Sequence, residues 1–116
     1  MDKRFEIVWL YDFYAPLITE RRRKLLQMHL EDDLSLGEIS QITGITRQGV
    51  YDAIKAAQDK LEQCEEKLGM LKRYRAITGQ VNKCRQILSQ IRVEGEDGEM
   101  MKLAIKELEK IESIER

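Results

Sequence analysis

The stretch "SLGEISQITGITRQGVYDAIKAAQDKL", residues 35–61, sets a glycine between two helical patterns. The first pattern opens with Ser35 and has Glu38 three residues later, which is the spacing of a helix capping box. Its apolar residues recur at helical spacing and predict a buried stripe made of Leu36, Ile39 and Ile42. We therefore expect a short helix that ends before the glycine.

A turn and a second helix are predicted next. Gly44 can adopt the left-handed backbone of a tight turn, Ile45 can fill the angle between the helices, and Thr46 can cap the second helix. That helix begins at Arg47, and its apolar face carries Val50, Ile54, Ala57 and Leu61. This is the spacing of a helix-turn-helix, but helical hairpins built only for packing share it. Spacing alone leaves DNA reading and plain packing as open alternatives.

The two glycines of this stretch are expected to respond to substitution in opposite ways. Valine at Gly44 should lower stability by roughly 1 to 3 kcal/mol, because a β-branched residue is strained in the left-handed region. Gly49 lies inside the predicted second helix. Alanine there should raise stability slightly, because glycine costs a helix interior about 1 kcal/mol relative to alanine.

The composition favours an all-α chain with one domain, or one domain and an extension. Of the 116 residues, 42% are hydrophobic, 35% are charged and one is proline. The 20 Lys and Arg against 21 Asp and Glu give a net charge of −1, so any surface that holds nucleic acid must be local.

Helical patterns also precede the quoted stretch. A first helix is expected from Phe5 to Tyr14, ending near Pro16, with residues recurring at helical spacing at Phe5, Val8 or Trp9, and Tyr11 or Asp12. A second helix over residues 20–30, capped by Thr19, has an expected inner face of Leu25, Leu26, Met28 and Leu30. Its four cations at residues 21–24 should lie mostly in solvent.

The second half predicts long amphipathic helices. One apolar seam runs through Val50, Ile54, Ala57, Leu61, Cys64, Leu68 and Leu71, and a second through Ile77, Val81, Cys84, Leu88 and Ile91. Gly69 and Gly79 are candidate bends, and a last helix carries Met101, Ala104, Leu108 and Ile111. We expect a helix-turn-helix domain over residues 1–61 and a packing and dimerisation extension over 62–116. A homodimer is expected because the seam from Leu61 to Leu71 and the apolar face from Met101 to Ile111 exceed what the small domain can cover.

A run without acidic residues, from Leu71 to Val93, contains six cations: Lys72, Arg73, Arg75, Lys83, Arg85 and Arg92. Such a basic patch, with Tyr74 among its cations, could hold RNA or DNA phosphates or an acidic protein. The alternative, which we prefer, is a solvated face that pairs with acidic residues of a neighbouring helix, including Glu62, Glu65 and Glu66.

Little in the chain points to catalysis. His29 is the only histidine, there is no phosphate-binding glycine loop, and Cys64 and Cys84 lack metal-ligand spacing and fit core positions. We expect no enzymatic activity, cofactor or metal. Glu6 and Asp12 interrupt the apolar N-terminal segment, which excludes a signal peptide or membrane span and predicts a cytoplasmic location.

Two longer stretches carry a family resemblance. "LEDDLSLGEISQITGITRQGVYDAIK" and "LYDFYAPLITERRRKLLQMHL" resemble the YlxM family of small bacterial helix-turn-helix proteins, and more distantly the fourth region of bacterial sigma factors. The resemblance covers about the first 70 residues. It implies a regulatory DNA-binding protein, with a role in the signal recognition particle pathway inferred from the usual gene neighbours. The alternative is a non-enzymatic adaptor that binds a protein or RNA component of that particle.

The resemblance also implies roles for particular residues. Ile39, Ile45 and Val50 match the buried positions of the family, and Thr43 departs from it because an apolar residue is usual there. The recognition helix and its outer faces would present Thr46, Arg47, Gln48, Tyr51, Asp52 and Lys55 to duplex DNA.

Overall fold

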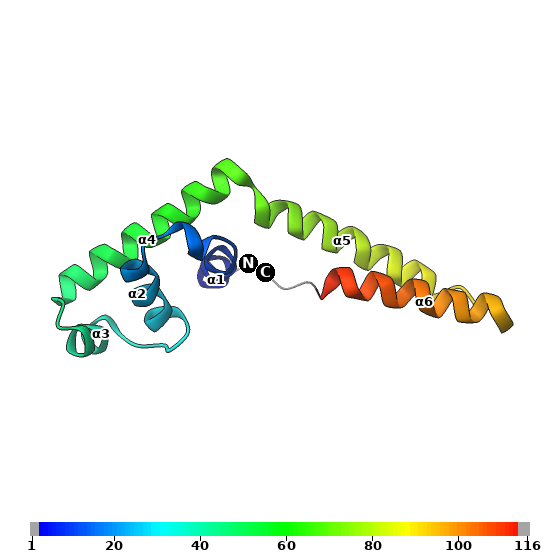
Figure 1. The fold of residues 1–116 in the computed structure, drawn as a ribbon, viewed down its shortest axis with the longest axis horizontal. Coiled ribbons are helices and arrows are strands. Elements are labelled where there is room, and N and C mark those ends of the chain that lie inside the picture. Colours follow the sequence, from blue (N-terminus) through cyan, green and yellow to red (C-terminus); the bar gives the residue numbers. More distant parts are fainter. Residues whose placement is uncertain (1–2, 114–116) are drawn as a thin grey trace. The chain divides into compact units, whose positions relative to one another are not determined.

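The structure is a computed structural model and describes residues 3–113. Within them the chain forms six α-helices, one short 3-10 helix and no strand, which confirms the predicted all-α class (Figure 1). The elements are α1 (Lys3–Tyr14), η1 (Ala15–Leu17), α2 (Glu20–Leu30), α3 (Leu36–Thr43), α4 (Arg47–Leu68), α5 (Met70–Ser89) and α6 (Gly95–Glu112).

The chain divides into two compact units, one that runs through Leu71 and one that begins at Lys72. The division expected at residues 61 and 62 falls inside α4, so the compact unit is longer than the expected domain. The functional roles assigned to the two ranges stay predictions.

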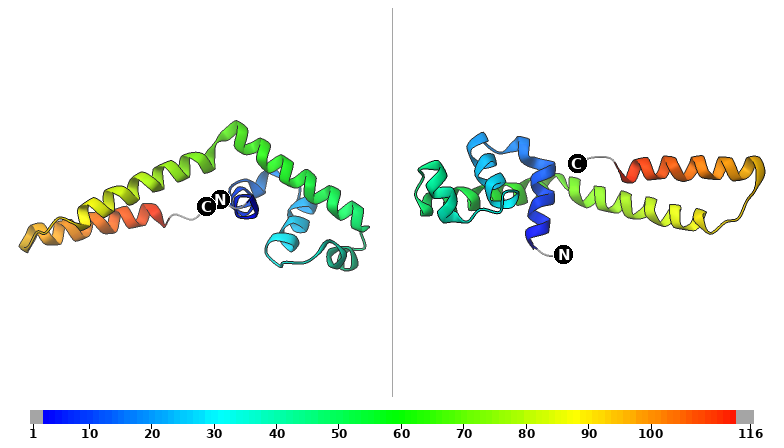
Figure 2. Two further views of the ribbon diagram at one scale, coloured as in Figure 1. Left: turned by 180° about the vertical axis from the view of Figure 1, so that it is seen from behind. Right: turned by 90° about the horizontal axis from the view of Figure 1, so that it is seen from below.

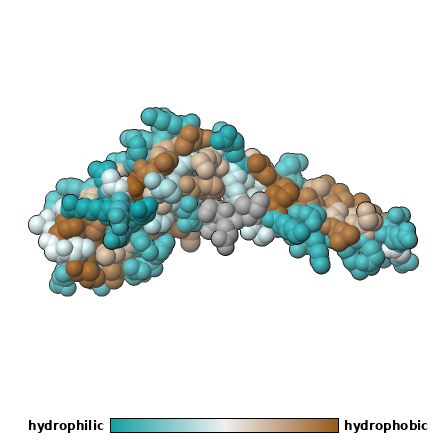
Figure 3. Space-filling view, viewed as in Figure 1, coloured by the Kyte–Doolittle hydropathy of each residue, from teal (hydrophilic) through white to brown (hydrophobic). Residues whose placement is uncertain are grey.

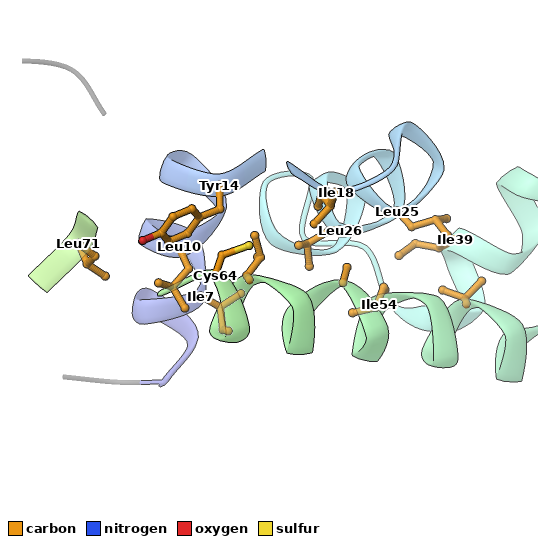
Figure 4. Close-up of a cluster of buried hydrophobic side chains, with 13 residues drawn as sticks. Ile7, Leu10, Tyr14, Ile18, Leu25, Leu26, Ile39, Ile54, Cys64 and Leu71 are labelled. Atoms are coloured by element: carbon orange, nitrogen blue, oxygen red, sulfur yellow. The ribbon is translucent and has the colours of Figure 1, made fainter. Parts of the chain in front are cut away.

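In the first unit, α1, α2 and α3 all pack against α4. The buried side chains lie between α4 and the other helices (Figure 4): Ile7, Leu10, Tyr14, Ile18, Leu25, Leu26, Ile39, Val50, Ile54, Ala57, Leu61, Cys64 and Leu71. The buried face that was predicted for α1 is wrong, because it is a different side of the helix that is buried: Phe5 is exposed, and Ile7 and Leu10 are buried instead. Every residue from Ile7 to Tyr11 is apolar, so the two faces are hard to distinguish from the sequence.

The seam of α4 is covered within the chain itself. Leu61, Cys64 and Leu71 are buried against the first unit, whereas Leu68 is 47% exposed. The expectation that the segment from Leu61 to Leu71 needs a second subunit is therefore wrong. Any argument for a dimer must come from the second unit.

The junction between α4 and α5 is held by a buried tyrosine. Gly69 ends α4 in the left-handed region, with φ of 62°, which confirms the expected bend. The Tyr14 hydroxyl donates to Glu65 Oε1 at 2.6 Å, the Met70 amide donates to that hydroxyl at 3.0 Å, and the Leu71 amide donates to Glu65 Oε1 at 3.0 Å. These two side chains satisfy amides that α5 leaves without helical partners in its first turn.

The second unit is a hairpin of α5 and α6, which lie side by side and run in opposite directions (Figure 2). Gly79 lies inside α5 and makes no bend there, so that expectation is wrong. Arg85 Nε donates to Glu112 Oε1 at 2.8 Å and ties the two helices together. None of the described residues from 72 to 113 is buried.

Candidate nucleic-acid interface

The helix α3 is closed at its start by the predicted capping box. The Glu38 amide donates to Ser35 Oγ at 3.1 Å, and the Ser35 amide donates back to Glu38 Oε1 at 3.1 Å. Of the expected stripe, Ile39 is fully buried and Leu36 is half-buried, but Ile42 is 62% exposed. The prediction for Ile42 is wrong because α3 turns its Ile39 side, and not the Ile42 side, toward α4.

The turn between α3 and α4 is fixed by hydrogen bonds from short polar side chains. Gly44 has φ of 77°, as expected, and its amide donates to the Ser40 carbonyl oxygen at 2.9 Å. Ser40 Oγ donates to the Ile45 carbonyl oxygen at 2.6 Å, and the Ile45 amide donates to Thr43 Oγ1 at 3.3 Å. Thr43, which departs from the family pattern, therefore satisfies a turn amide that an apolar residue would leave without this partner.

Substitution of Gly44 tests this turn. We expect Gly44→Val to lower the free energy of unfolding by roughly 1 to 3 kcal/mol, because the valine backbone is strained at this φ. No atom lies within 4 Å of an added Cβ, so the strain is in the backbone and does not come from a clash. Gly44→Ala should cost less. Denaturant unfolding of the two variants measures both effects, and a valine variant as stable as the wild type would contradict the turn geometry.

Gly49 is in a tighter place than the sequence suggested. Its amide donates to Thr46 Oγ1 at 3.0 Å, which is the cap of α4. A Cβ on Gly49 would lie 2.9 Å from Ile45 Cγ2 and 3.0 Å from Thr46 Oγ1. The structure therefore argues against a stabilising effect of alanine at this position, because the added methyl group would push on the turn and on its cap.

We now expect Gly49→Ala to lower the free energy of unfolding by about 1 kcal/mol, the loss at the cap and turn exceeding the gain in helix propensity. Gly37→Ala is the matched control within the same motif. Its added Cβ would meet only Ser35 Oγ, at an ordinary 3.9 Å, so this variant should be as stable as the wild type or slightly more so. A Gly49→Ala protein that gained stability as Gly37→Ala does would contradict the tight contact.

The outer face of the first turns of α4 is open to solvent. Arg47, Gln48 and Tyr51 are exposed and, together with Leu36 of α3, line a shallow surface hollow. The structure thus brings together three of the residues expected to approach DNA. Their side chains supply a guanidinium, an amide and a phenol on one surface of a capped helix.

The remaining expected residues of α4 are engaged along the same helix. Gln48 Nε2 donates to Asp52 Oδ1 at 3.0 Å, and Lys55 Nζ donates to Asp59 Oδ1 at 3.3 Å. The amide of Gln48 still has one N–H and its oxygen for a base edge, which is the pair that adenine requires. Thr46 uses its hydroxyl as the cap of α4, so its role is first of all structural.

Two cations of α2 lie next to Asp52, on the side of α4 that is turned away from Arg47 and Tyr51. Arg21 and Arg22 line a second hollow together with Thr19 of the α2 cap and Asp52 of α4, and Ala53 and Ala56 form the rest of it. The sequence placed these arginines in solvent without linking them to α4. Helical periodicity finds exposed cations, but it does not show which helix they neighbour.

The six cations of the basic run do not form one face. Within α5, a rotation of about 100° per residue leaves Lys72, Arg75 and Lys83 within about 80° of one another, but it turns Arg73 and Arg85 to other sides of the helix. Arg85 binds Glu112 and also donates to Asn82 Oδ1 at 2.6 Å, and Arg92 follows the end of α5. The pairing of Arg85 with an acidic neighbour agrees with the preferred interpretation, although the partner is on α6 and not on α4.

Residues with metal-binding or nucleophilic side chains are dispersed. Across residues 3–113 no group of three or more His, Cys, Asp and Glu side chains could hold a metal ion. His29 is half-buried, with Nδ1 lying 3.2 Å from the Leu34 carbonyl oxygen, as expected for a structural residue. Cys64 is buried, but Cys84 is exposed, so the core position predicted for Cys84 is wrong. In the same range of residues, no helix is long and apolar enough to cross a bilayer.

Comparison with known proteins points to one family. The family described as "Putative helix-turn-helix protein, YlxM / p13 like" matches residues 1–107. A UPF0122 protein of Thermoanaerobacter sp. (strain X514) is 44% identical over 81% of this chain and 80% of its own. A UPF0122 protein of Acetivibrio thermocellus is 38% identical over 96% of this chain and 97% of its own. A UPF0122 protein of Bacillus cereus (strain AH187) is 36% identical over 97% of this chain and 99% of its own.

Proposed function

Because the chain belongs to the YlxM / p13-like family of helix-turn-helix proteins, we propose that it binds duplex DNA through α4 and acts without catalysis. The observation that carries the proposal is the pair α3 and α4, joined by a left-handed glycine, with Arg47, Gln48 and Tyr51 exposed at the start of α4. In such motifs the first turns of the second helix enter the major groove.

Each group has a chemical role in this mechanism. Arg47 donates to guanine O6 and N7, and Gln48, oriented by Asp52, makes the paired contact to adenine. Arg21 and Arg22 of α2, with the start of α3, hold phosphates beside the groove and fix the register of the protein. In this proposal, Lys55 and Tyr51 contact the flanking backbone or base edges.

The experiment compares binding to a preferred duplex and to random duplex DNA. We expect Arg47→Ala combined with Gln48→Ala to weaken binding to the preferred sequence about 10- to 100-fold, because one bidentate base contact is worth roughly 1 to 3 kcal/mol. Binding to random DNA should change much less, because phosphate contacts supply most of it. Fluorescence anisotropy at fixed salt concentration measures both affinities.

Two controls separate the proposed site from general effects. Lys60→Ala combined with Gln63→Ala removes the same kinds of side chain from exposed positions farther along α4 and should leave the preference intact. Loss of Lys72, Arg73 and Arg75 should have little effect or act equally on all sequences. If that loss abolished binding and the Arg47, Gln48 variant did not, the adaptor function would be favoured over DNA reading.

We propose further that DNA binding serves to regulate expression in the signal recognition particle pathway, in the cytoplasm and as a homodimer. The pathway rests on the family resemblance alone. The homodimer rests on the second unit, which has no buried residue among those described and so needs a partner surface.

A further inference from the structure

The α5 and α6 hairpin has an interior face and an uncovered apolar face. The side chains between the two helices are half-buried: Val81, Arg85 and Leu88 on α5, and Met101, Ile105, Leu108 and Glu112 on α6. Other apolar side chains stay exposed and form one stripe on each helix: Ile77, Cys84 and Ile87 on α5, and Met100, Ala104 and Ile111 on α6. Leu103 of α6 is exposed as well, but it lies about 80° from the centre of this stripe. Figure 3 shows apolar residues over both helices of this unit.

The two exposed stripes lie on the same side of the hairpin. Each residue of an α-helix is rotated by about 100° from the one before it. On both helices this places the exposed stripe roughly 80 to 90° from the interior face, and in both cases the offset is opposite to the direction in which the helix winds from its N-terminus to its C-terminus. Since the helices run in opposite directions, rotation in this same sense brings both stripes to one side. Each helix then offers two apolar faces at nearly a right angle, which is the pattern of a helix in a four-helix bundle.

The charges of the hairpin indicate what covers this face. Helix α5 carries five basic and no acidic residues, whereas α6 carries six acidic and three basic residues. A second hairpin can lie on the face in two symmetric ways. If the two-fold axis is parallel to the helices, each α5 neighbours the partner's α6, and if the axis is perpendicular, α5 neighbours the partner's α5. Only the first arrangement puts helices of opposite charge side by side everywhere in the bundle.

We propose that a second copy of this chain covers the apolar face, forming an antiparallel four-helix bundle in which each α5 packs between its own α6 and the partner's α6. The inference deepens the homodimer of the proposed function and does not depend on DNA binding. It also places the N-termini of both α5 helices at the same end of the bundle.

Sedimentation equilibrium of the full chain tests the face. The wild type should be a dimer at micromolar concentration. Ile87→Asp and Met100→Asp should each raise the dimer dissociation constant by about 100-fold or more, because an uncompensated carboxylate would be buried twice per dimer. The controls Gln86→Asp and Lys102→Asp change the adjacent exposed residue on each helix, away from the face, and should remain dimers. A monomeric wild type, or equal loss of dimer in the controls, would overturn the proposal.

Disulfide formation tests the arrangement. One chain keeps its native Cys84, and the other carries Cys84→Ser and Ala104→Cys, while Cys64 stays buried in both. If α5 packs on the partner's α6, oxidation should link the two chains when they are mixed and neither chain efficiently by itself. Cross-linking of the Cys84 chain to itself would indicate α5 against α5, and either that result or the absence of a mixed link would overturn the proposed arrangement. Chains with Cys84→Ser alone, which contain only Cys64, should not link and provide the background.

Discussion

Replacement of Ile39 by alanine is expected to lower the free energy of unfolding by about 2 to 5 kcal/mol, because it leaves a cavity under the helix-turn-helix. Ile39 is fully buried between α3 and α4 and belongs to the core of the first unit. It is the buried side chain of the short α3, and the half-buried Leu36 packs against the same core. Urea or guanidinium unfolding followed by circular dichroism gives the loss directly.

Ile42→Ala is the matched control for this prediction. It makes the same chemical change in the same helix, but Ile42 is 62% exposed, so its loss should stay within about 0.5 kcal/mol. Equal losses for the two variants would mean that α3 is rotated relative to α4. The exposed residues at the start of α4 would then have a different position relative to the turn from the one described.

Removal of the Tyr14 hydroxyl is the second large effect that we expect. Tyr14→Phe should cost about 1.5 to 3 kcal/mol, because the hydroxyl bonds to the carboxylate of Glu65 and also accepts from the Met70 amide. Tyr51→Phe removes the same atom from an exposed ring and should change stability little. Thermal unfolding of both variants provides the comparison, and a Tyr14→Phe protein as stable as Tyr51→Phe would show that the junction contributes nothing.

The same junction predicts a dependence on alkaline pH. Burial, followed by the hydrogen bond to Glu65, raises the pKa of Tyr14 above its ordinary value of 10.0. Because the folded protein favours the neutral phenol, this contribution to stability is complete below pH 10 and is lost as the pH rises through the folded pKa. The stability difference between the wild type and Tyr14→Phe should therefore shrink above pH 10.

Local chemistry made the helix boundaries predictable. Ser35, Thr19 and Thr46 cap helices through contacts only three residues away, and Gly44 and Gly69 end helices in the one backbone region that favours glycine. The donor and the acceptor of such a contact are neighbours in the sequence, so the contact can be predicted from the sequence alone. The three caps and the helix end at Gly44 were therefore predicted correctly, and Gly69 was predicted as a bend.

Contacts across the fold were beyond such reasoning. Ile39 and Ile42 share one stripe in the sequence, and only the packing of α3 on α4 shows which of them is buried. The bond between Tyr14 and Glu65 joins residues 51 positions apart, and the close contact that disfavours alanine at Gly49 depends on where the Ile45 and Thr46 side chains lie. For the candidate site, the pattern identified the exposed residues of α4, but not the arginines of α2 that lie next to Asp52.

The most direct test of the proposed function is selection by the wild-type full chain from a pool of random duplex DNA, with a random RNA pool and the signal recognition particle GTPase assayed in parallel. The account predicts enrichment of one duplex sequence, with the enrichment lost in the Arg47→Ala, Gln48→Ala variant and kept in the Lys60→Ala, Gln63→Ala control. Absence of any enriched duplex sequence, together with tight binding of the RNA pool or the GTPase, would contradict it.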